Sequence, residues 1–280
     1  MTWRLVDLLS GDQVEQEPSS LYSVSRTDAP LVYTVPHAGL LVPVDLVDTW
    51  NLGEAAVQDT DLHTDRLYDL PGTRVITSLN RYAVNMNRPR WREKGVSEYD
   101  EEDALRTYLK GMRPSWAKPI QNDWKQALLG VYDMYHAAVR ALLQERIDEY
   151  GYVFLVTAHS MNAEADDNTP DSGRRPDVTI CTEYGRGTEP SVIEAMQTGF
   201  PDGFDVAVDD PYAGGFTTEA YAAGSDVVHG VQIEVNKACY MDEDSYAYEA
   251  DQAAVVQDAL RDAVSRGLDE VRRLEDGDQD

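Results

Sequence analysis

Two histidines in this sequence each follow a short apolar run that is typical of a buried strand. His37 comes one proline after residues 31–35, and His159 comes one alanine after residues 152–157. Between them lies an acidic cluster at residues 59–65, DTDLHTD, which holds three aspartates. Zinc sites that hydrolyse substrates use three protein ligands of this kind and leave a fourth position open to water. The order histidine, carboxylate, histidine therefore predicts a hydrolytic zinc site, with the choice among the three aspartates left open.

Each part of this pattern also has a simpler explanation. A single histidine after a strand is more often a hydrogen-bonded structural residue than a metal ligand. The acidic cluster could be a solvated helix start, because aspartates stabilise the N-terminus of a helix. His136 lies in the middle of a helical segment beside Tyr135, and we expect it to be structural.

A further candidate is Glu234, which lies between Ile233 and Val235 in the apolar segment 227–235. A buried carboxylate costs free energy unless it is paired or used, and burial raises its pKa. A raised pKa suits a general base that takes a proton from water. We therefore expect Glu234 to be catalytic, the alternative being a glutamate that faces solvent on an edge strand.

Two arginines could bind the carboxylates of an acidic substrate. Arg81 and Arg88 lie in the segment LNRYAVNMNRP, in a chain with only 24 basic residues. A guanidinium group can hold a carboxylate with two parallel hydrogen bonds, a geometry that lysine cannot match. We expect both arginines and Asn87 in a substrate pocket, with Arg66 and Lys237 as the next candidates. The alternative is that the arginines form surface ion pairs.

Six short blocks of the sequence resemble blocks of the N-formylglutamate amidohydrolase family, in the same order. The resemblance extends from about Leu31 to Glu243, and the blocks read VPHAG, DTDLHTDRLYDL, LNRYAVNMNRP, TAHSM, PDVTICTEYG and VHGVQIEVNKACYMDE. Each block is short, but six in order make an accidental match improbable. Members of that family remove an acyl group from an acidic amino acid, and their fold is related to that of zinc carboxypeptidases.

The resemblance implies a role for each candidate. It implies a zinc ion held by His37, His159 and one carboxylate, for which it favours Asp61, and it places Glu234 beside the zinc as the proton shuttle. The substrate contacts that we expect are Arg81, Arg88, His63, Asp65 and Asn87. His63 could instead be a fourth zinc ligand, and Asp65 could form an ordinary surface pair with Arg66.

The reaction implied by the resemblance is hydrolysis of an amide bond in a small acyl-amino acid, most simply N-formyl-L-glutamate. The alternatives are a related zinc amidase or carboxypeptidase with another substrate, and a non-catalytic binding protein of the same fold. The sequence departs from the family at two places. Thr157 replaces an acidic residue before the block AHS, so another group must support the second nitrogen of His159. The loop TEYGRGTEP also replaces a glycine-rich loop.

The elements that must position these residues alternate along the chain. Helices are predicted at residues 53–69, 122–150 and 246–274 from their apolar periodicity. Strands are predicted at residues 31–35, 74–77, 82–86, 152–157, 178–182 and 227–235. Residues 88–119 are expected to form a surface excursion that could serve as a lid. This order predicts one α/β domain over residues 1–280, with a mixed, mostly parallel sheet flanked by helices and ligands at the strand ends.

The charge balance limits the possible partners. Acidic residues outnumber basic ones by 51 to 24, giving a net charge of -27, while 42% of the chain is apolar. Such a chain is globular with an acidic surface, and it repels nucleic acid and anionic lipid. The simplest explanation is a salt-rich, halophilic cytoplasm, because salt screens the self-repulsion. An acidic protein from an ordinary cytoplasm is the alternative.

The sequence contains no sign of membrane insertion or of a disulfide. No apolar run approaches the roughly 18 residues that a membrane-spanning helix needs, and the opening residues do not form a signal-peptide core. Cys181 and Cys239 each lie in an apolar segment and are expected to be buried thiols. We therefore expect a cytoplasmic protein.

Overall fold

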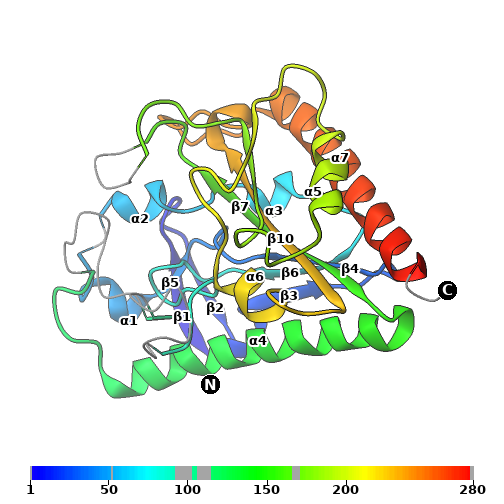
Figure 1. Cartoon of the computed structure of the whole chain (residues 1–280). Helices are drawn as coiled ribbons and strands as arrows, with labels where there is room; N and C mark the ends of the chain where they lie inside the picture. The colour runs from blue at the N-terminus through cyan, green and yellow to red at the C-terminus, as the bar shows by residue number, and fades with distance from the viewer. Residues whose placement is uncertain (1, 52, 92–102, 106–114, 166–170, 278–280) are drawn as a thin grey trace.

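The main feature of the computed structural model is a seven-stranded sheet (Figure 1). The described residues are 2–51, 53–91, 103–105, 115–165 and 171–277. In spatial order the strands are β3 (Tyr22–Ser25), β6 (Thr73–Thr77), β4 (Leu31–Val35), β7 (Val153–Met161), β10 (Val228–Asn236), β8 (Val178–Cys181) and β9 (Val206–Val208). Strands β6, β4, β7 and β10 are parallel neighbours, whereas β3 is antiparallel to β6 and β8 is antiparallel to β10. The predicted mixed, mostly parallel sheet is confirmed.

A smaller antiparallel sheet lies near the N-terminus. Its strands, in spatial order, are β2 (Gln13–Gln16), β1 (Trp3–Asp7) and β5 (Leu41–Pro43). Trp3 and Leu5 alternate toward the core and are buried. These strands were not predicted, because runs of three to five residues carry little periodic signal.

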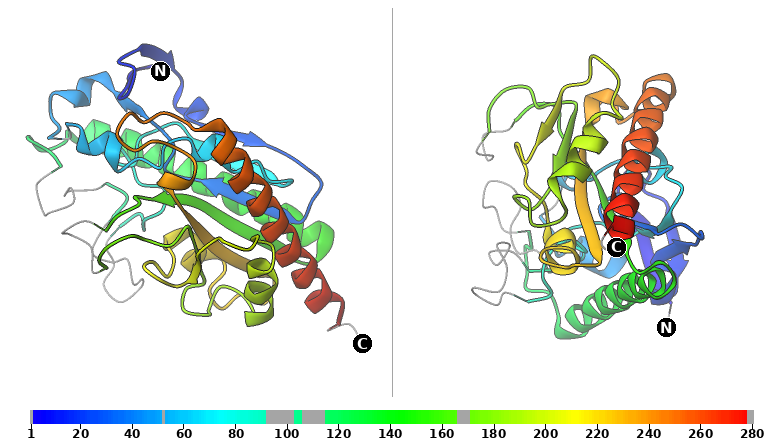
Figure 2. Two further views of the ribbon diagram at one scale, coloured as in Figure 1. Left: turned by 90° about the horizontal axis from the view of Figure 1, so that it is seen from above. Right: turned by 45° about the vertical axis from the view of Figure 1, so that its right-hand side comes forward.

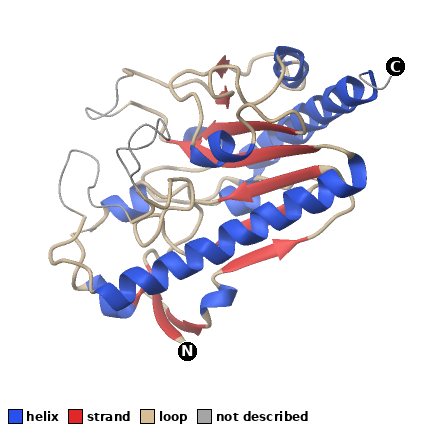
Figure 3. Ribbon diagram, turned by 60° about the horizontal axis from the view of Figure 1, so that its bottom comes forward, coloured by secondary structure: helices blue, strands red, loops and turns tan. Residues whose placement is uncertain are grey.

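Helices cover both faces of the large sheet. They are α1 (Val44–Val47), α2 (Ala55–Gln58), α3 (Thr64–Leu67), α4 (Asn122–Tyr150), α5 (Pro190–Gln197), α6 (Phe216–Tyr221) and α7 (Ala250–Gly277), with 3-10 turns η1 (Pro18–Ser20) and η3 (Lys237–Cys239). Helix α4 packs on one face and runs roughly alongside the strands, as Figure 3 shows. Helix α7 runs along the opposite face with α5 beside it (Figure 2).

Strand β7 shows why its sequence is apolar at every position. Val153 and Leu155 belong to the core under α4, whereas Phe154 and Val156 belong to the core under α7. Successive side chains of a strand point to opposite faces, so a strand covered on both sides has no polar alternation. The same reasoning applies to β10, which is buried throughout.

The long predicted helices are confirmed. Helix α4 ends where predicted, at Gly151, whose positive φ of 86° allows its N–H to bond to the carbonyl of Ile147 at 2.8 Å. Helix α7 begins four residues later than predicted and ends three residues later. Cys181 is buried in β8 as expected, whereas Cys239 is only half-buried.

Two predicted elements are wrong. Residues 82–86 form a turn and an irregular segment instead of a strand, because the amides of Tyr82 and Ala83 bond to Asn80. The helix predicted over residues 53–69 is two short helices, α2 and α3, separated by a loop. The loop turns at His63, which has a left-handed φ of 64° that an α-helix cannot contain.

Two other expectations concern the chain as a whole. Most of the predicted surface excursion at residues 88–119 lies outside the described residues. The assignment of residues 1–280 to one domain stays a prediction. None of the described helices is long and apolar enough to cross a membrane.

Candidate active site

The ends of three parallel strands bring the predicted residues together. His37 lies two positions after β4, and His159 and Glu234 lie near the ends of β7 and β10. Strands β7 and β10 pair with Glu234 opposite His159, so both side chains leave the same face of the sheet. We expected His159 to follow its strand. Instead β7 continues to Met161, because β10 pairs with it along its whole length.

A buried cluster of His37, Asp61 and His159 has the composition of a metal site. One ligand atom from each of the three lies within 4.8 Å of the other two. Asp61 Oδ2 lies 2.8 Å from His159 Nδ1 and 3.6 Å from His37 Nδ1. Asp61 belongs to the loop between α2 and α3, where its backbone N–H bonds to the carbonyl of His37 at 3.1 Å. Within the acidic cluster, Asp61 is therefore buried in a loop, whereas Asp65 is exposed in the first turn of α3.

The protonation of this cluster suits a cation. Burial and the nearby Arg81 hold the pKa of His37 well below its usual value, so its imidazole is neutral at pH 7. Burial raises the pKa of Asp61, but the hydrogen bond from His159 and the proximity of His37 outweigh burial and hold that pKa well below its usual value. His37 Nδ1 is buried and has no hydrogen-bond partner among the described residues. Two imidazoles and one carboxylate, with such an unsatisfied nitrogen, are a donor set that fits zinc.

Two asparagines hold the outer nitrogens of the histidines. Asn85 Oδ1 lies 2.7 Å from His37 Nε2, and Asn87 Nδ2 lies 3.0 Å from His159 Nε2. Because the amide Nδ2 of Asn87 is a donor, His159 Nε2 accepts in this contact, so Asn87 holds the ring without replacing the acceptor that an acidic residue at position 157 would offer. Groups that bind the second nitrogen of a metal-binding histidine fix the orientation of its ring.

Glu234 is buried beside this cluster, with 7% of its surface exposed. Burial raises its pKa to about 7, against a lowering effect of the nearby His159. Gln232 donates a hydrogen bond of 2.9 Å to Glu234 Oε1 and accepts one of 3.0 Å from Asn87 Nδ2. The amide oxygen of Asn87 accepts the backbone N–H of Thr217, at the start of α6. Asn87 therefore links the histidine, the glutamate and α6 in one hydrogen-bonded chain.

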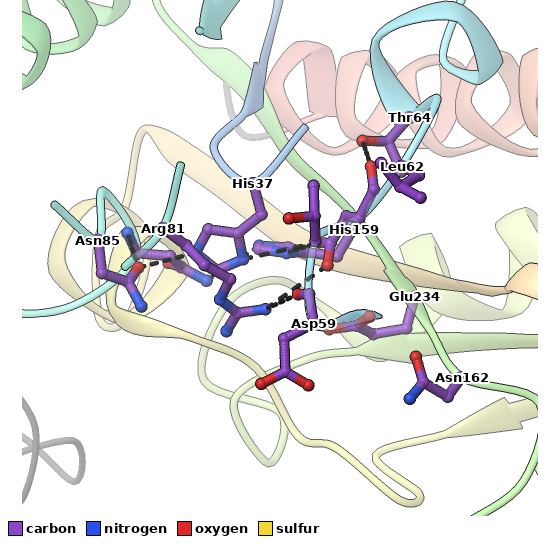
Figure 4. A network of polar contacts seen from close by, with 12 residues as sticks. His37, Asp59, Leu62, Thr64, Arg81, Asn85, His159, Asn162 and Glu234 are labelled. Atoms are coloured by element: carbon purple, nitrogen blue, oxygen red, sulfur yellow. Dashed lines mark hydrogen bonds and ion pairs between the residues drawn. The ribbon is translucent and has the colours of Figure 1, made fainter. Parts of the chain in front are cut away.

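These residues line a cavity of about 270 Å³, part of which is shown in Figure 4. Four cationic side chains line it: Arg81, Arg88, Arg175 and Lys237. Arg81 Nη1 lies 3.5 Å from Asp61 Oδ1 and donates to the carbonyl of Asp59 at 3.1 Å. Arg88 Nη1 donates to the carbonyl of Asn87 at 2.9 Å. The expected positions of both arginines in a pocket agree with this geometry.

The structure does not bring His63 and Asp65 to this cavity. His63 Nε2 lies 2.9 Å from the carbonyl of Tyr246, and its ring packs against Tyr248. Asp65 is exposed at the start of α3. The left-handed turn at His63 is the physical reason, because it directs the residues after Asp61 away from the strand ends.

Several cavity residues were not predicted. Gln232 lies two positions before Glu234 on β10, and the period of a strand puts both side chains on one face, so the sequence did contain a signal for it. Arg175 and Asn162 come from loops, where no periodicity indicates which way a side chain points. Asp59 also lines the cavity, but its carboxylate accepts a hydrogen bond from the hydroxyl of Tyr82, and it is not part of the metal cluster.

Known proteins similar to this chain share its length and fold. An N-formylglutamate deformylase from Pseudomonas aeruginosa is 29% identical over 256 residues, which cover 86% of this chain and 93% of that protein. Another from Pseudomonas putida is 26% identical over 247 residues, covering 83% and 90%. The crystal structure of an N-formylglutamate amidohydrolase from Ralstonia eutropha is 20% identical and has a TM-score of 0.76, covering 90% of this chain and 98% of that one. At this identity the crystal structure supports the fold alone.

The family comparison extends over most of the sequence. Residues 29–241 match the family described as N-formylglutamate amidohydrolase. This range contains His37, Asp61, His159 and Glu234, and it agrees with the six blocks recognised in the sequence. The further likeness to zinc carboxypeptidases stays a prediction. The chain belongs to the N-formylglutamate amidohydrolase family.

Proposed function

We propose that this chain hydrolyses N-formyl-L-glutamate to formate and L-glutamate with the help of a zinc ion. The observation that carries the proposal is the buried cluster of His37, Asp61 and His159, with the buried Glu234 beside it. As a member of its family the protein is an amidohydrolase that acts on carbon–nitrogen bonds other than peptide bonds. The names of its curated relatives support the formyl group and the glutamate.

Glu234 and the residues that would hold zinc have separate roles in the reaction. When bound there, zinc would polarise the formyl oxygen and lower the pKa of a water molecule to about 7. Glu234 takes a proton from the water that attacks the formyl carbon. It then gives that proton to the amine nitrogen as the carbon–nitrogen bond breaks, so formate and glutamate leave. A pKa of about 7 suits a group that must accept and return a proton near neutral pH.

We assign substrate binding to the basic side chains that line the cavity. Arg81 and Arg88 can each pair with a carboxylate, and Arg81 lies next to Asp61, so it suits the α-carboxylate, which is close to the bond that breaks. Asn87 supports His159 and Glu234 from the same segment. His63 and Asp65 have no part in this proposal, because neither lines the cavity. A cytoplasmic location stays a prediction.

Metal analysis and a formate-release assay test the proposal. The purified protein should bind about one zinc per chain, and His37→Ala and His159→Ala should each abolish binding. His229→Gln is a matched control, because His229 is buried but pairs with Glu275 outside the cluster. Formate should be released from N-formyl-glutamate faster than from the N-formyl forms of Asp and Gln, and N-acetyl-glutamate should be a poor substrate. A full zinc content in the double mutant H37A/H159A would refute the site.

A further inference from the structure

We infer that Arg175 and Lys237, joined by Asn162, form a second anion-binding subsite that takes the side-chain carboxylate of an acidic substrate. This inference rests on the proposed function, because it divides the substrate's two carboxylates between two groups of cations. Arg81, next to Asp61, takes the α-carboxylate. The second subsite would then distinguish glutamate from glutamine, which differ only in the charge and donors of that distal group.

The fold places the three residues of the second subsite at one edge of the sheet. Asn162 directly follows the last residue of β7, and Lys237 begins the turn η3 directly after β10. Arg175 precedes β8, which runs antiparallel to β10, so the start of β8 lies at the same edge as the end of β10. Three segments that are distant in sequence thus meet beside the metal cluster.

The contacts within this subsite hold both cations in place. Arg175 Nη1 donates to the carbonyl of Asn162 at 3.2 Å, and Lys237 Nζ donates to Asn162 Oδ1 at 2.8 Å. The Arg175 Nε and Nη2 groups donate to the two carboxylate oxygens of Asp171, at 2.7 and 3.2 Å. The Arg175 guanidinium also lies 5.3 Å from the ring centre of Tyr212, which lines the same cavity. A cation fixed in this way loses little entropy when it binds a carboxylate.

Burial and charge favour an anion here. Arg175 is 4% exposed and Lys237 is 3% exposed, although both line the cavity. The cavity as a whole has four basic and three acidic side chains, whereas the chain has 24 basic and 51 acidic ones. The cavity therefore has more basic than acidic side chains, in a chain in which acidic side chains prevail. Buried charges are costly unless they are paired or bind a ligand, so we expect an anion here.

The two groups of cations lie on either side of the reacting centre. In Figure 4, Glu234 lies between Arg81 on one side and Asn162, which anchors the second subsite, on the other. Arg81 touches the metal cluster directly, whereas Arg175 and Lys237 donate hydrogen bonds to Asp171, Asn162 and the carbonyl of Gln58. An amino acid with its formyl group at the metal cluster would extend its side chain away from Arg81. A dicarboxylic substrate matches this arrangement better than a monocarboxylic one.

Binding of the product amino acid tests the subsite without the need for turnover. Titration calorimetry of L-glutamate and L-glutamine would use the zinc-loaded protein and its variants. Arg175→Gln should weaken L-glutamate binding by about 10- to 100-fold, the usual effect of losing a charge-assisted pair, and L-glutamine binding by less than about 3-fold. Lys237→Gln should act in the same direction. Arg174→Gln is the matched control, because the neighbouring Arg174 is exposed and lies outside the cavity.

Two further variants separate recognition from folding. Arg175→Gln leaves Asp171 without its bidentate partner and could destabilise the protein. The double variant D171N/R175Q removes both charges and so leaves no unpaired buried carboxylate; it should fold while showing the same loss of glutamate preference. Arg175→Lys keeps the charge without the fork and should recover part of the preference. Melting temperatures would be measured for each variant.

Each outcome bears on the subsite or on the proposed function separately. Equal weakening of L-glutamate and L-glutamine, or an unchanged preference in the double variant and in Lys237→Gln, would overturn the subsite. If the preference collapses but the unaltered protein releases no formate from N-formyl-glutamate, the subsite stands and the proposed reaction is wrong. If formate is released at equal kcat/KM from N-formyl-glutamate and N-formyl-glutamine, the reaction stands and the subsite is wrong.

Discussion

Replacement of Glu234 by Gln removes a buried proton acceptor and preserves its shape. The side chain is 7% exposed, and Gln232 donates to its Oε1, a hydrogen bond that the amide oxygen of the variant can still accept. The packing of β10 against β7 and β8 should therefore survive. A general base typically contributes about 10²- to 10⁴-fold to the rate, so we expect kcat to fall by about that factor.

The assay separates a lost base from a lost site. Formate release would be followed with N-formyl-glutamate, together with zinc content and L-glutamate binding. For Glu234→Gln we expect zinc content and binding close to those of the unaltered protein, so that kcat and kcat/KM fall together. Glu270→Gln is the control, because Glu270 pairs with Arg273 on α7 and does not line the cavity.

Two results would refute this reasoning. Full activity in Glu234→Gln would make the glutamate structural, and the proton pathway proposed here would be wrong. Loss of zinc in the variant would make Glu234 a ligand. The role of Asp61 as the carboxylate ligand would then need to be reassigned.

Three other perturbations test the pocket, the fold and the surface. At least one of the two variants Arg81→Lys and Arg88→Lys should have a kcat/KM for N-formyl-glutamate that is lower by about 10-fold or more, because a lysine cannot form two parallel hydrogen bonds. Unchanged values in both variants would mean that other residues bind the carboxylates. Burial lowers the pKa of His136 from 6.5 to about 4. As pH falls, His136 therefore binds a proton in the unfolded chain before it does so in the folded one. Up to about 3 kcal/mol of stability should be lost between pH 6.5 and 4. Chemical denaturation should show a smaller loss in His136→Gln, and an equal loss would contradict the reasoning. The melting temperature should rise between dilute buffer and molar KCl, and a constant value would show that the charge of -27 is harmless.

The sequence predicts best the helices whose apolar residues recur at a regular spacing and the strands that are apolar at every position. Helices α4 and α7 each repeat apolar residues along one face for about seven turns or more, and β7 and β10 are apolar because helices cover both faces of the sheet. Residues 82–86 mislead for the opposite reason. Tyr82, Val84 and Met86 are fully buried, as in a strand, but they lie under loops and a helix instead of in a ladder.

The residues of the candidate site were likewise predicted only in part. His37 and His159 could be placed because parallel strands end at a common edge, and their cluster with Asp61 follows from that topology. The substrate contact expected of Asp65 came from the family resemblance, and residues 53–69 were predicted to form one helix. A single left-handed residue, His63, breaks that helix and removes Asp65 from the cavity. Backbone conformation at one position therefore decides which aspartate lies beside the two histidines.

The net charge of the chain does not reveal where its charged side chains lie in the structure. The chain of net charge -27 repels a doubly negative substrate at long range, yet it gathers four cations in one cavity. Salt acts differently on these two effects, because it screens exposed charges more than about 10 Å apart at 0.1 M and weakens buried pairs much less. High salt should thus remove the repulsion that slows the approach of substrate and leave most of the attraction from Arg81, Arg175 and their neighbours. An acidic surface and a cavity lined by cations are therefore compatible at high salt, where screening favours folding and reduces the long-range repulsion of an acidic ligand.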